Sequence, residues 1–278
     1  MRVATATSHR QYFSDFAAAL RYWRGKRGYS QLQLSNISSI SQRHISFLEK
    51  GRSQPSKDLI LRLGVALEVP LRQRNIMLLA AGFAPAYHER KLTDPEVAPV
   101  RRALDFMLAQ QLPYPALVVD RLWNLQMANA SASGLIRWLL NVPPDHDLSK
   151  DGAANVLKMM FDPTGLRQFL VNWQTVCSDL LHWIQREALS DGPGSEATAL
   201  LDELLALAGG GLCVETPDLD RHTLPFLPMQ LRKDGVELNL FTTIATLGTP
   251  RDVTLHELRI ESFFAADDAT AEWFRARA

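Results

Sequence analysis

The side chains best placed for chemistry in this sequence lie between residues 30 and 56, SQLQLSNISSISQRHISFLEKGRSQPS. Ser30 and Ser41 are typical N-cap residues, and each precedes a short segment with helical spacing. The second segment, residues 42–50, combines few apolar residues with several hydrogen-bonding side chains. Its positions outside the apolar stripe are Gln42, Arg43, Ser46 and Phe47. Such a surface is suited to hydrogen bonding with a binding partner.

The apolar residues of this region predict how the two helices pack. Leu34 and Ile37 are three apart, so we expect them to share one buried face of the first helix, and Ile45 and Leu48 have the same role in the second. Gly51 follows at a position where helices commonly end in a left-handed residue. Spacing alone leaves two interpretations open: a helix-turn-helix whose second helix enters the DNA major groove, and an ordinary αα-hairpin in a helical domain.

The charge distribution favours the first interpretation. The whole chain is balanced, with 30 basic and 30 acidic residues, but residues 1–91 carry 15 Lys and Arg against 5 Asp and Glu. Residues 92–278 carry 15 against 25. Such asymmetry is typical of a chain with one nucleic-acid-binding half, although a solvated basic surface on a small helical domain gives the same balance. The acidic half would repel phosphate, so we expect DNA contacts in the N-terminal half.

The segment from Phe13 to Pro85 resembles the XRE/lambda-repressor-like DNA-binding family, through its pattern SQ…S…I…LE-G-R…PS. This resemblance implies an all-α domain that binds double-stranded DNA. It also implies five helices, at about residues 13–27, 31–37, 42–50, 56–68 and 71–81. Two positions depart from the family pattern, because Ser39 replaces the preferred Gly of the turn and Ser35 replaces the preferred Ala. A serine in a left-handed turn costs free energy, but neither departure removes a contact residue.

The resemblance assigns roles to individual residues. Gln42 and Arg43 match the family's base-reading positions, and Gln31 matches its phosphate-contacting glutamine. Arg24 and Glu49 fall where the family often has a salt bridge between the first and third helices. The predicted DNA-binding residues are Gln31, Ser41, Gln42, Arg43, Ser46, Phe47 and Arg52, of which Ser41 and Arg52 are expected to position the phosphate backbone.

The length and composition suit two globular domains, since the chain has 278 residues of which 46% are hydrophobic. We expect a helix-turn-helix domain over 1–90 and a second domain over 91–278, joined around 82–100, where three prolines argue against a long helix. No apolar run approaches the ~18–20 residues that cross a bilayer. The N-terminus has no apolar signal-peptide core. A cytoplasmic protein with no membrane partner is therefore expected.

The second domain is predicted to be α+β, with an antiparallel sheet. Its expected strands are residues 116–119, 123–127, 227–235, 236–248 and 253–267. One helix is expected to begin near Asn129. Three more are expected over residues 163–189, 196–207 and 268–277. The residues Lys233-Asp234-Gly235 are a good hairpin signal between two of the strands. The order strand, turn, strand and helix over 115–140 is also similar to the start of a PAS domain.

This half resembles the ligand-binding domain of the MmyB-like regulators, in which a helix-turn-helix precedes a PAS-like sensor. The resemblance rests on PALVVDRLWNLQMANASA, GLRQFLVNW and FTTIATLGTPRDVTLHELRIESFF, within about residues 100–275. It implies a sensor for a small, largely apolar ligand, such as a bound fatty acid or similar lipid-like molecule, with no other cofactor. The expected ligand wall is Leu117, Trp123, Phe169, Trp173, Phe241 and Phe263, with Arg167 or Asn172 at the polar head. For each aromatic residue, a place in an ordinary hydrophobic core is an equal alternative.

No catalytic or metal-binding site is predicted. The sequence has no G-x-S-x-G or H-E-x-x-H motif, and its seven histidines are scattered. Cys177 and Cys213 have neither metal-ligand spacing nor a disulfide framework, so we expect two small buried side chains.

The predicted function is therefore that of a sequence-specific transcriptional regulator whose C-terminal sensor modulates operator binding. One recognition helix covers few base pairs, so we expect a homodimer on a palindromic operator. The interface is expected in the second domain, because the basic first domain would repel its copy. The alternative is a regulator whose second domain binds a protein partner, as in antitoxin-type regulators.

Overall fold

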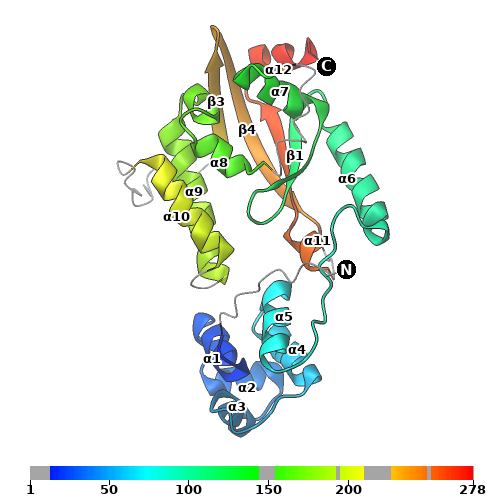
Figure 1. Ribbon diagram of the computed structural model, residues 1–278, viewed down its shortest axis with the longest axis vertical. Coiled ribbons are helices and arrows are strands. Elements are labelled where there is room, and N and C mark those ends of the chain that lie inside the picture. The colour runs from blue at the N-terminus through cyan, green and yellow to red at the C-terminus, as the bar shows by residue number, and fades with distance from the viewer. Residues whose placement is uncertain (1–12, 144–153, 192–194, 210–226, 249–251, 278) are drawn as a thin grey trace, which may run out of the picture. The chain divides into compact units, whose positions relative to one another are not determined.

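The computed structural model describes residues 13–143, 154–191, 195–209, 227–248 and 252–277 (Figure 1). These residues form two compact units. The first contains the described residues up to Glu89, together with Asp252 and Val253 from much later in the sequence. The second begins at Arg90 and resumes at Thr254. The first unit is therefore discontinuous in sequence.

The first unit consists of five helices, as predicted. They are α1 (Phe16–Lys26), α2 (Gln31–Ser38), α3 (Gln42–Glu49), α4 (Lys57–Ala66) and α5 (Leu71–Ala80). All five contribute to one hydrophobic core, in which Trp23 is the largest side chain. Its other fully buried members include Leu20, Leu34, Ile45, Leu48, Ile60, Leu63 and Met77. The strict helical spacing of these residues explains why the sequence pattern was informative here.

The turn between α2 and α3 has the expected local geometry. Ser30 and Gln33 form a reciprocal capping box at the start of α2, and Ser41 Oγ accepts the His44 N–H at the start of α3. Ser39 adopts a left-handed conformation with φ of 56°, and Gly51 does so with φ of 67° after α3.

The prediction that Ile37 shares the buried face of α2 is wrong. Leu34 is fully buried, whereas 51% of Ile37 is exposed. Ser38, one turn after Leu34, takes the inward position and donates its hydroxyl hydrogen to the Leu34 carbonyl over 2.6 Å. The inward stripe of α2 therefore follows the i, i+4 row.

The second unit is built on a five-stranded antiparallel sheet, as predicted. Its strands are β1 (Ala116–Val119), β2 (Leu125–Ala128), β3 (Leu227–Lys233), β4 (Val236–Thr246) and β5 (Arg259–Ala265), in the order β2-β1-β5-β4-β3. The predicted hairpin between β3 and β4 is confirmed, with Asp234 and Gly235 at positive φ. This matches the preference of two-residue hairpin turns for left-handed residues.

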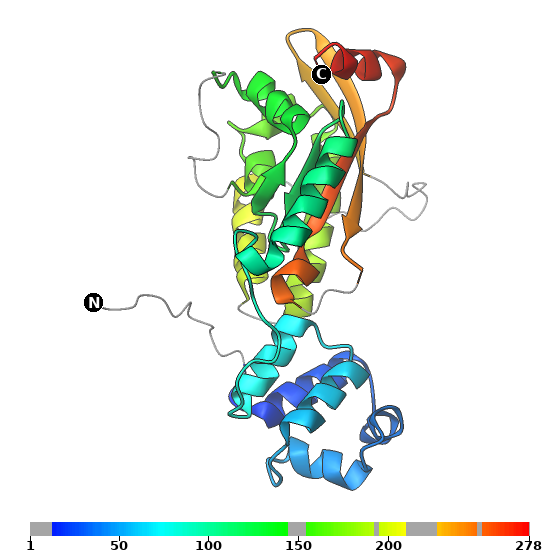
Figure 2. The same cartoon turned by 90° about the vertical axis from the view of Figure 1, so that its right-hand side faces the viewer.

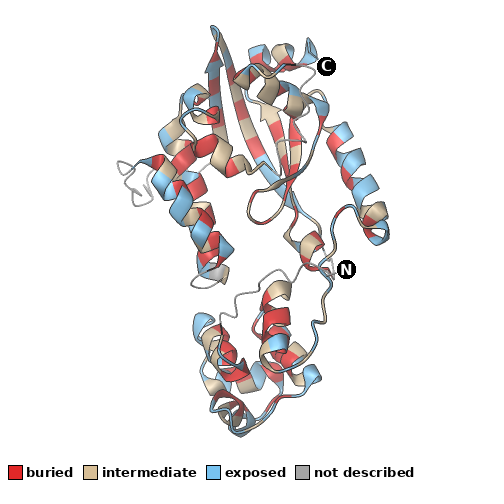
Figure 3. Cartoon of the chain, in the orientation of Figure 1, coloured by how far each residue is buried: buried red, intermediate tan, exposed pale blue. Residues whose placement is uncertain are grey.

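Helices cover the two faces of this sheet unequally (Figure 1). One face, which we call the inner face, packs against α7 (Ala130–Leu140), α8 (Val156–Phe161), α9 (Trp173–Asp191) and α10 (Glu196–Ala208) in the largest hydrophobic cluster. The other face packs Ala116, Val118 and Ile260 against α6 (Ala98–Gln110) and a few neighbouring residues. Figure 2 shows α6 alongside the sheet from a second direction. Along β3 and the first half of β4, buried residues alternate with half-buried or exposed ones (Figure 3).

The single helix predicted over 163–189 is wrong. A 3-10 turn, η3 (Leu166–Phe169), comes first, and α9 begins only at Trp173. Between them the backbone bonds to the edge of the sheet, where Val171 N–H donates to the Gln230 carbonyl over 2.8 Å. Asn172 also bonds to this edge, accepting from Gln230 N–H at 3.0 Å. Pairing with β3 therefore overrides the local helical spacing.

Three smaller expectations also differ from the structure. The strand expected over 253–267 is a helix, α11 (Val253–Glu257), followed by β5. The strand expected from 123 begins at Leu125, because the preceding residues form the turn after β1. Helix α8 was not foreseen. The final helix, α12 (Asp268–Arg275), and α10 lie where they were expected.

Candidate functional site

The exposed surface of α3 carries the residues expected to read bases. Gln42 and Arg43 are exposed, whereas Ile45 and Leu48 are buried, so the helix directs its N-terminal polar residues outward. Ser46 and Phe47 are half-buried. The Arg43 guanidinium carbon lies 5.4 Å from the Phe47 ring centroid, one turn along the helix. This contact restricts the Arg43 side chain while leaving its N–H groups available for hydrogen bonding.

Of the three residues expected to position phosphate, Gln31 begins α2, and Ser41 and Arg52 lie at the two ends of α3. Ser41 accepts the His44 N–H at 3.3 Å, and a hydroxyl in this role keeps its own hydrogen for donation. The helix N-terminus beside it attracts anions. Arg52 is exposed beyond the other end, where its backbone N–H donates to the Phe47 carbonyl over 2.9 Å.

A buried carboxylate holds the helix-turn-helix together. Glu49 is 4% exposed and accepts from Arg24 Nε at 2.5 Å and from Arg24 Nη2 at 3.1 Å. This confirms the ion pair expected between the first and third helices. Gln31 Nε2 donates over 2.7 Å to Glu49 Oε2, the same oxygen that accepts from Arg24 Nη2. Sequence reasoning missed this bond, which gives Gln31 an internal role besides any contact with phosphate.

Five of the six expected ligand-wall residues contribute to the hydrophobic cluster on the inner face. Trp123 and Phe263 are buried, and Leu117, Phe169 and Trp173 pack at the margin. The ring centroids of Trp123 and Trp183 are 5.3 Å apart in a T-shaped arrangement. Those of Trp173 and Phe161 are 5.1 Å apart.

The expectation that Phe241 faces the other wall residues is wrong. Phe241 is paired in register with Phe264, and neighbouring positions of β5 face opposite sides of the sheet. The rings of Phe241 and Phe264 therefore stack, with centroids 5.1 Å apart, on the face opposite to Phe263. Because side chains alternate along a strand, the pairing of β4 with β5 determines that Phe241 and Phe263 lie on opposite faces of the sheet.

The two residues expected at the polar head of a ligand have different surroundings. The Arg167 guanidinium lies 4.6 Å from the Trp173 ring centroid, and its Nη1 donates to the Leu207 carbonyl over 3.2 Å. Burial raises the pKa of the Cys177 thiol to about 11, and the positive charge of Arg167 opposes this rise. Asn172 bonds to β3 through both its amide oxygen and its amide nitrogen. Both ends of the Asn172 amide are thus bonded to β3, whereas the Arg167 guanidinium bonds to one backbone carbonyl.

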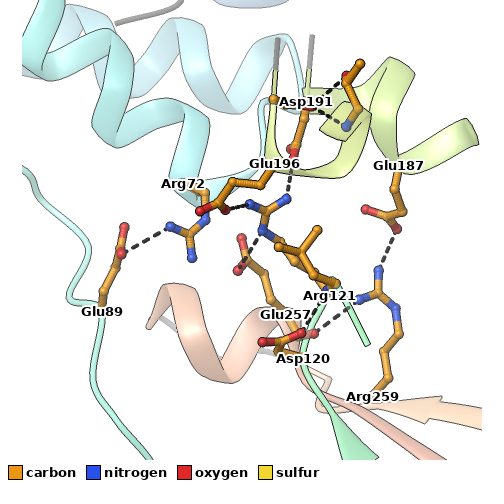
Figure 4. Close-up of polar contacts among 12 residues, drawn as sticks. Arg72, Glu89, Asp120, Arg121, Glu187, Asp191, Glu196, Glu257 and Arg259 are labelled. Atoms are coloured by element: carbon orange, nitrogen blue, oxygen red, sulfur yellow. Dashed lines mark hydrogen bonds and ion pairs between the residues drawn. The ribbon is translucent and has the colours of Figure 1, made fainter. Parts of the chain in front are cut away.

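An ion-pair network at one end of the sheet was not foreseen (Figure 4). Arg121, after β1, is 7% exposed and pairs with Asp191 of α9, with Glu196 at 2.6 Å and with Glu257 of α11 at 3.6 Å. The network joins three regions that are distant in sequence, around residues 121, 191–196 and 257, so no local sequence pattern predicts it.

Beside Arg121, a second arginine forms its own ion pair (Figure 4). Arg259 Nη2 lies 2.5 Å from Glu187 Oε1, and its guanidinium lies over the Trp183 ring. Burial raises the pKa of Glu187, and the charge of Arg259 acts in the opposite direction. This pair connects β5 to α9.

Comparison with known families decides what kind of protein this is. A model described as the MmyB-like transcription regulator ligand binding domain matches residues 100–276, more than half of the chain. The chain belongs to this family. A helix-turn-helix model also matches this MmyB-like regulator, over residues 20–73. The protein therefore combines a DNA-binding unit with a ligand-binding unit, and both families are those of transcription regulators rather than enzymes.

Other comparisons add little to the description of this MmyB-like regulator. No curated protein sequence matches it. A solved structure described as an RNA-binding light-oxygen-voltage receptor is similar at 14% identity, covering 99% of this chain and 70% of that one. The TM-score of 0.26 is too low to indicate a shared fold. Among the described helices, none is long and apolar enough to span a membrane.

Proposed function

We propose that this MmyB-like regulator binds a palindromic operator as a homodimer, and that a small apolar ligand in the second unit changes its operator affinity. The observation that carries the proposal is the pairing of two different surfaces in one chain. One is the outward polar end of α3, held by Glu49; the other is an aromatic-rich core on the inner face of the sheet.

The DNA-binding part follows from the chemistry of α3. Arginine bonds bidentately to guanine O6 and N7, and glutamine bonds to adenine N6 and N7, so Arg43 and Gln42 would read base edges. Ser41 and Arg52 would position the backbone, from which phosphate contacts gain affinity but no sequence preference. A dimer doubles the number of base pairs read.

The sensing part follows from the inner-face cluster. Trp123, Phe169 and Trp173 together offer an apolar, aromatic wall suited to an acyl-type chain, as a fatty-acid-like ligand would have. A ligand shifts an equilibrium only through its different affinities for two states. Coupling free energies of ~1–3 kcal/mol between two sites are typical, which corresponds to about a 5- to 150-fold change in operator affinity.

The division of the chain supports such coupling. Val253 N–H donates to the His88 carbonyl over 2.8 Å within the first unit, and Asp252 forms a β-bridge with His88. The next residues continue into α11, whose Glu257 pairs with Arg121, and then into β5 of the sensor sheet. A change in the position of β5 would therefore be transmitted along the chain to this bridge.

Two measurements test the proposal in sequence. Native mass spectrometry of the purified full-length protein would reveal a retained small molecule and the mass of a dimer. Operator binding would then be compared before and after that molecule is removed. We expect a change of at least about fivefold in the dissociation constant. An unchanged operator affinity would reject ligand control.

A protein partner of the second unit is the alternative function. Large apolar side chains are exposed there, with Phe106 of α6 65% exposed and Leu189 of α9 67% exposed. Exposed apolar groups of this size favour association when they form a continuous patch. Loss of a co-purifying protein in a Phe106→Asp variant, with no ligand detected in the wild type, would favour this alternative.

A further inference from the structure

The inner face of the sensor sheet contains a buried carboxyl group among apolar side chains. Glu261, in the middle of β5, is 3% exposed. Its cross-strand neighbours are Leu117 of β1 and Ile244 of β4, so all three side chains share one face. The next residue of β5 on that face, Phe263, belongs to the hydrophobic cluster that packs against α8, α9 and α10.

Within the described part of the chain, this carboxyl group has a hydroxyl partner but no cation. The Thr242 side chain, itself 4% exposed, hydrogen-bonds to it. Arg259, the preceding residue of β5 on the same face, pairs instead with Glu187 (Figure 4). Burial raises the pKa of Glu261 to about 7, and the Thr242 hydrogen bond opposes the rise only in part.

An acidic group in this position lowers the stability of the folded protein when it is ionised. Buried carboxylates are usually paired with a cation or bound by several donors, because desolvation disfavours the charged form. Buried groups with strongly perturbed pKa values gather at functional sites. In the described residues the protein gives Glu261 one hydrogen-bonding partner, so the group retains acceptor capacity that a ligand can use.

A polar group within the inner-face cluster has no hydrogen-bond partner among the described residues. The Trp123 side chain is 2% exposed, and its Nε1–H has no hydrogen-bond acceptor among the described residues. Trp123 also has a φ of 63°, a left-handed conformation that is strained for a bulky residue. Strain and unsatisfied donors in a core point to a binding role, since they persist only where the surroundings impose them.

We propose that Glu261 and Thr242 bind the polar head of the sensor's ligand, and that this head donates hydrogen bonds. The ligand class is an apolar chain ending in an amine or an amide, rather than a free carboxylate. This inference rests on the proposed ligand-sensing function and narrows it. An ammonium head supplies the cation that Glu261 lacks, and an amide head donates its N–H groups to the carboxyl group.

Arg167 is the competing anchor, and it favours the opposite chemistry. Its guanidinium would attract a carboxylate head. It already donates to the Leu207 carbonyl and lies over Trp173, so its need for a further partner is smaller than that of Glu261. A carboxylate brought to Glu261 would place two acids together in a region of low polarity, which disfavours binding. Binding of the head at Arg167 therefore predicts that an acid binds more tightly than an amine, and binding at Glu261 predicts the reverse.

The test compares three probes that differ only in the head: decylamine, decanamide and decanoic acid. Full-length protein would be titrated with each at neutral pH, using calorimetry after retained molecules are removed. We expect the amine to bind tightest, then the amide, with the acid at least about tenfold weaker than the amine. Glu261→Gln should remove the preference for the amine. Glu237→Gln, an exposed glutamate of β4 paired with Arg232, is the matched control and should change nothing.

Folding is checked by thermal unfolding of each variant. Thr242→Val keeps the shape of its side chain and removes the hydroxyl; it provides a second measurement if Glu261→Gln does not fold, and it should weaken amine binding severalfold. If decanoic acid binds tightest and loses its affinity in Arg167→Gln, the inference is overturned while ligand sensing survives. Equal amine binding by wild type and both variants also overturns it. If no probe binds, the proposed acyl-ligand sensing fails as well.

Discussion

Arg24 Nε donates to Glu49 Oε1 over 2.5 Å, and this bond ties α1 to the end of α3. The same carboxylate accepts from Gln31 at the start of α2. Glu49 thus joins the first three helices through side-chain hydrogen bonds. α3 packs into the core through Ile45 and Leu48, and the Glu49 carboxylate ties its C-terminal end to α1 and α2.

Glu49→Ala should destabilise the first unit by about 2–3 kcal/mol. Breaking a fully buried ion pair costs ~3–5 kcal/mol, and Arg24 remains partly solvated with 22% of its side chain exposed. Urea denaturation followed by helical circular dichroism measures the change. Glu89→Ala removes the more exposed Arg72–Glu89 pair and should cost less than about 1 kcal/mol. Equal effects would show that the buried network is unimportant.

Arg43→Ala should reduce the preference for operator over random DNA, whereas Arg52→Ala should reduce the affinity for both. Loss of a bidentate base contact removes ~1–3 kcal/mol of discrimination, so Arg43→Ala should bind operator and random DNA with similar affinities. Arg52→Ala should weaken both and reduce the slope of log affinity against log salt by about one. Fluorescence anisotropy at several salt concentrations gives both quantities. A uniform loss for Arg43→Ala would assign that residue to phosphate instead.

Trp173→Ala should abolish the response to ligand. The ring packs on Phe161 and beneath Arg167 at the margin of the inner-face cluster, so its removal takes away apolar wall area. The cost to stability can reach ~3–5 kcal/mol, and folding must be established first. Operator binding with and without the ligand retained on purification is the measurement.

Phe241→Ala is the matched control for Trp173→Ala. It removes an aromatic ring from the opposite face of the sheet and should leave the ligand response intact. A folded Trp173→Ala protein that still responds would show that Trp173 is ordinary core.

The stability of the second unit should fall as pH rises from about 4.5 to about 7. The folded-state pKa of Glu261 is raised from 4.5 to about 7 by burial, so in this window the folded state binds more protons than the unfolded state. One pKa unit corresponds to ~1.4 kcal/mol, which puts the contribution of this group at about 3 kcal/mol. Chemical denaturation at several pH values should show a flatter profile for Glu261→Gln. Parallel profiles would place the titration elsewhere.

The sequence predicts the first unit well because its signals are local. Ser30, Ser41 and Gly51 act within one turn of their own helices, and the core spacing of Ile45 and Leu48 is read directly. The sensor unit depends more on contacts distant in sequence. Asn172 interrupts a strongly helical pattern because β3, some 56 residues later, offers its backbone. Arg121 and Glu261 gain their character from a sheet register that no local window contains.

The bridge between His88 and Asp252 limits how this regulator can be divided. A fragment that ends at residue 90 would contain α1 to α5 of the DNA-binding unit. It would still lose one backbone hydrogen bond, because the His88 carbonyl would no longer accept from the Val253 N–H. If a different sensor is joined to this DNA-binding unit, a substitute is therefore needed for Asp252 and Val253, which come much later in the sequence than the rest of the unit. The two units can be exchanged between proteins only if Asp252 and Val253 are transferred together with the DNA-binding unit.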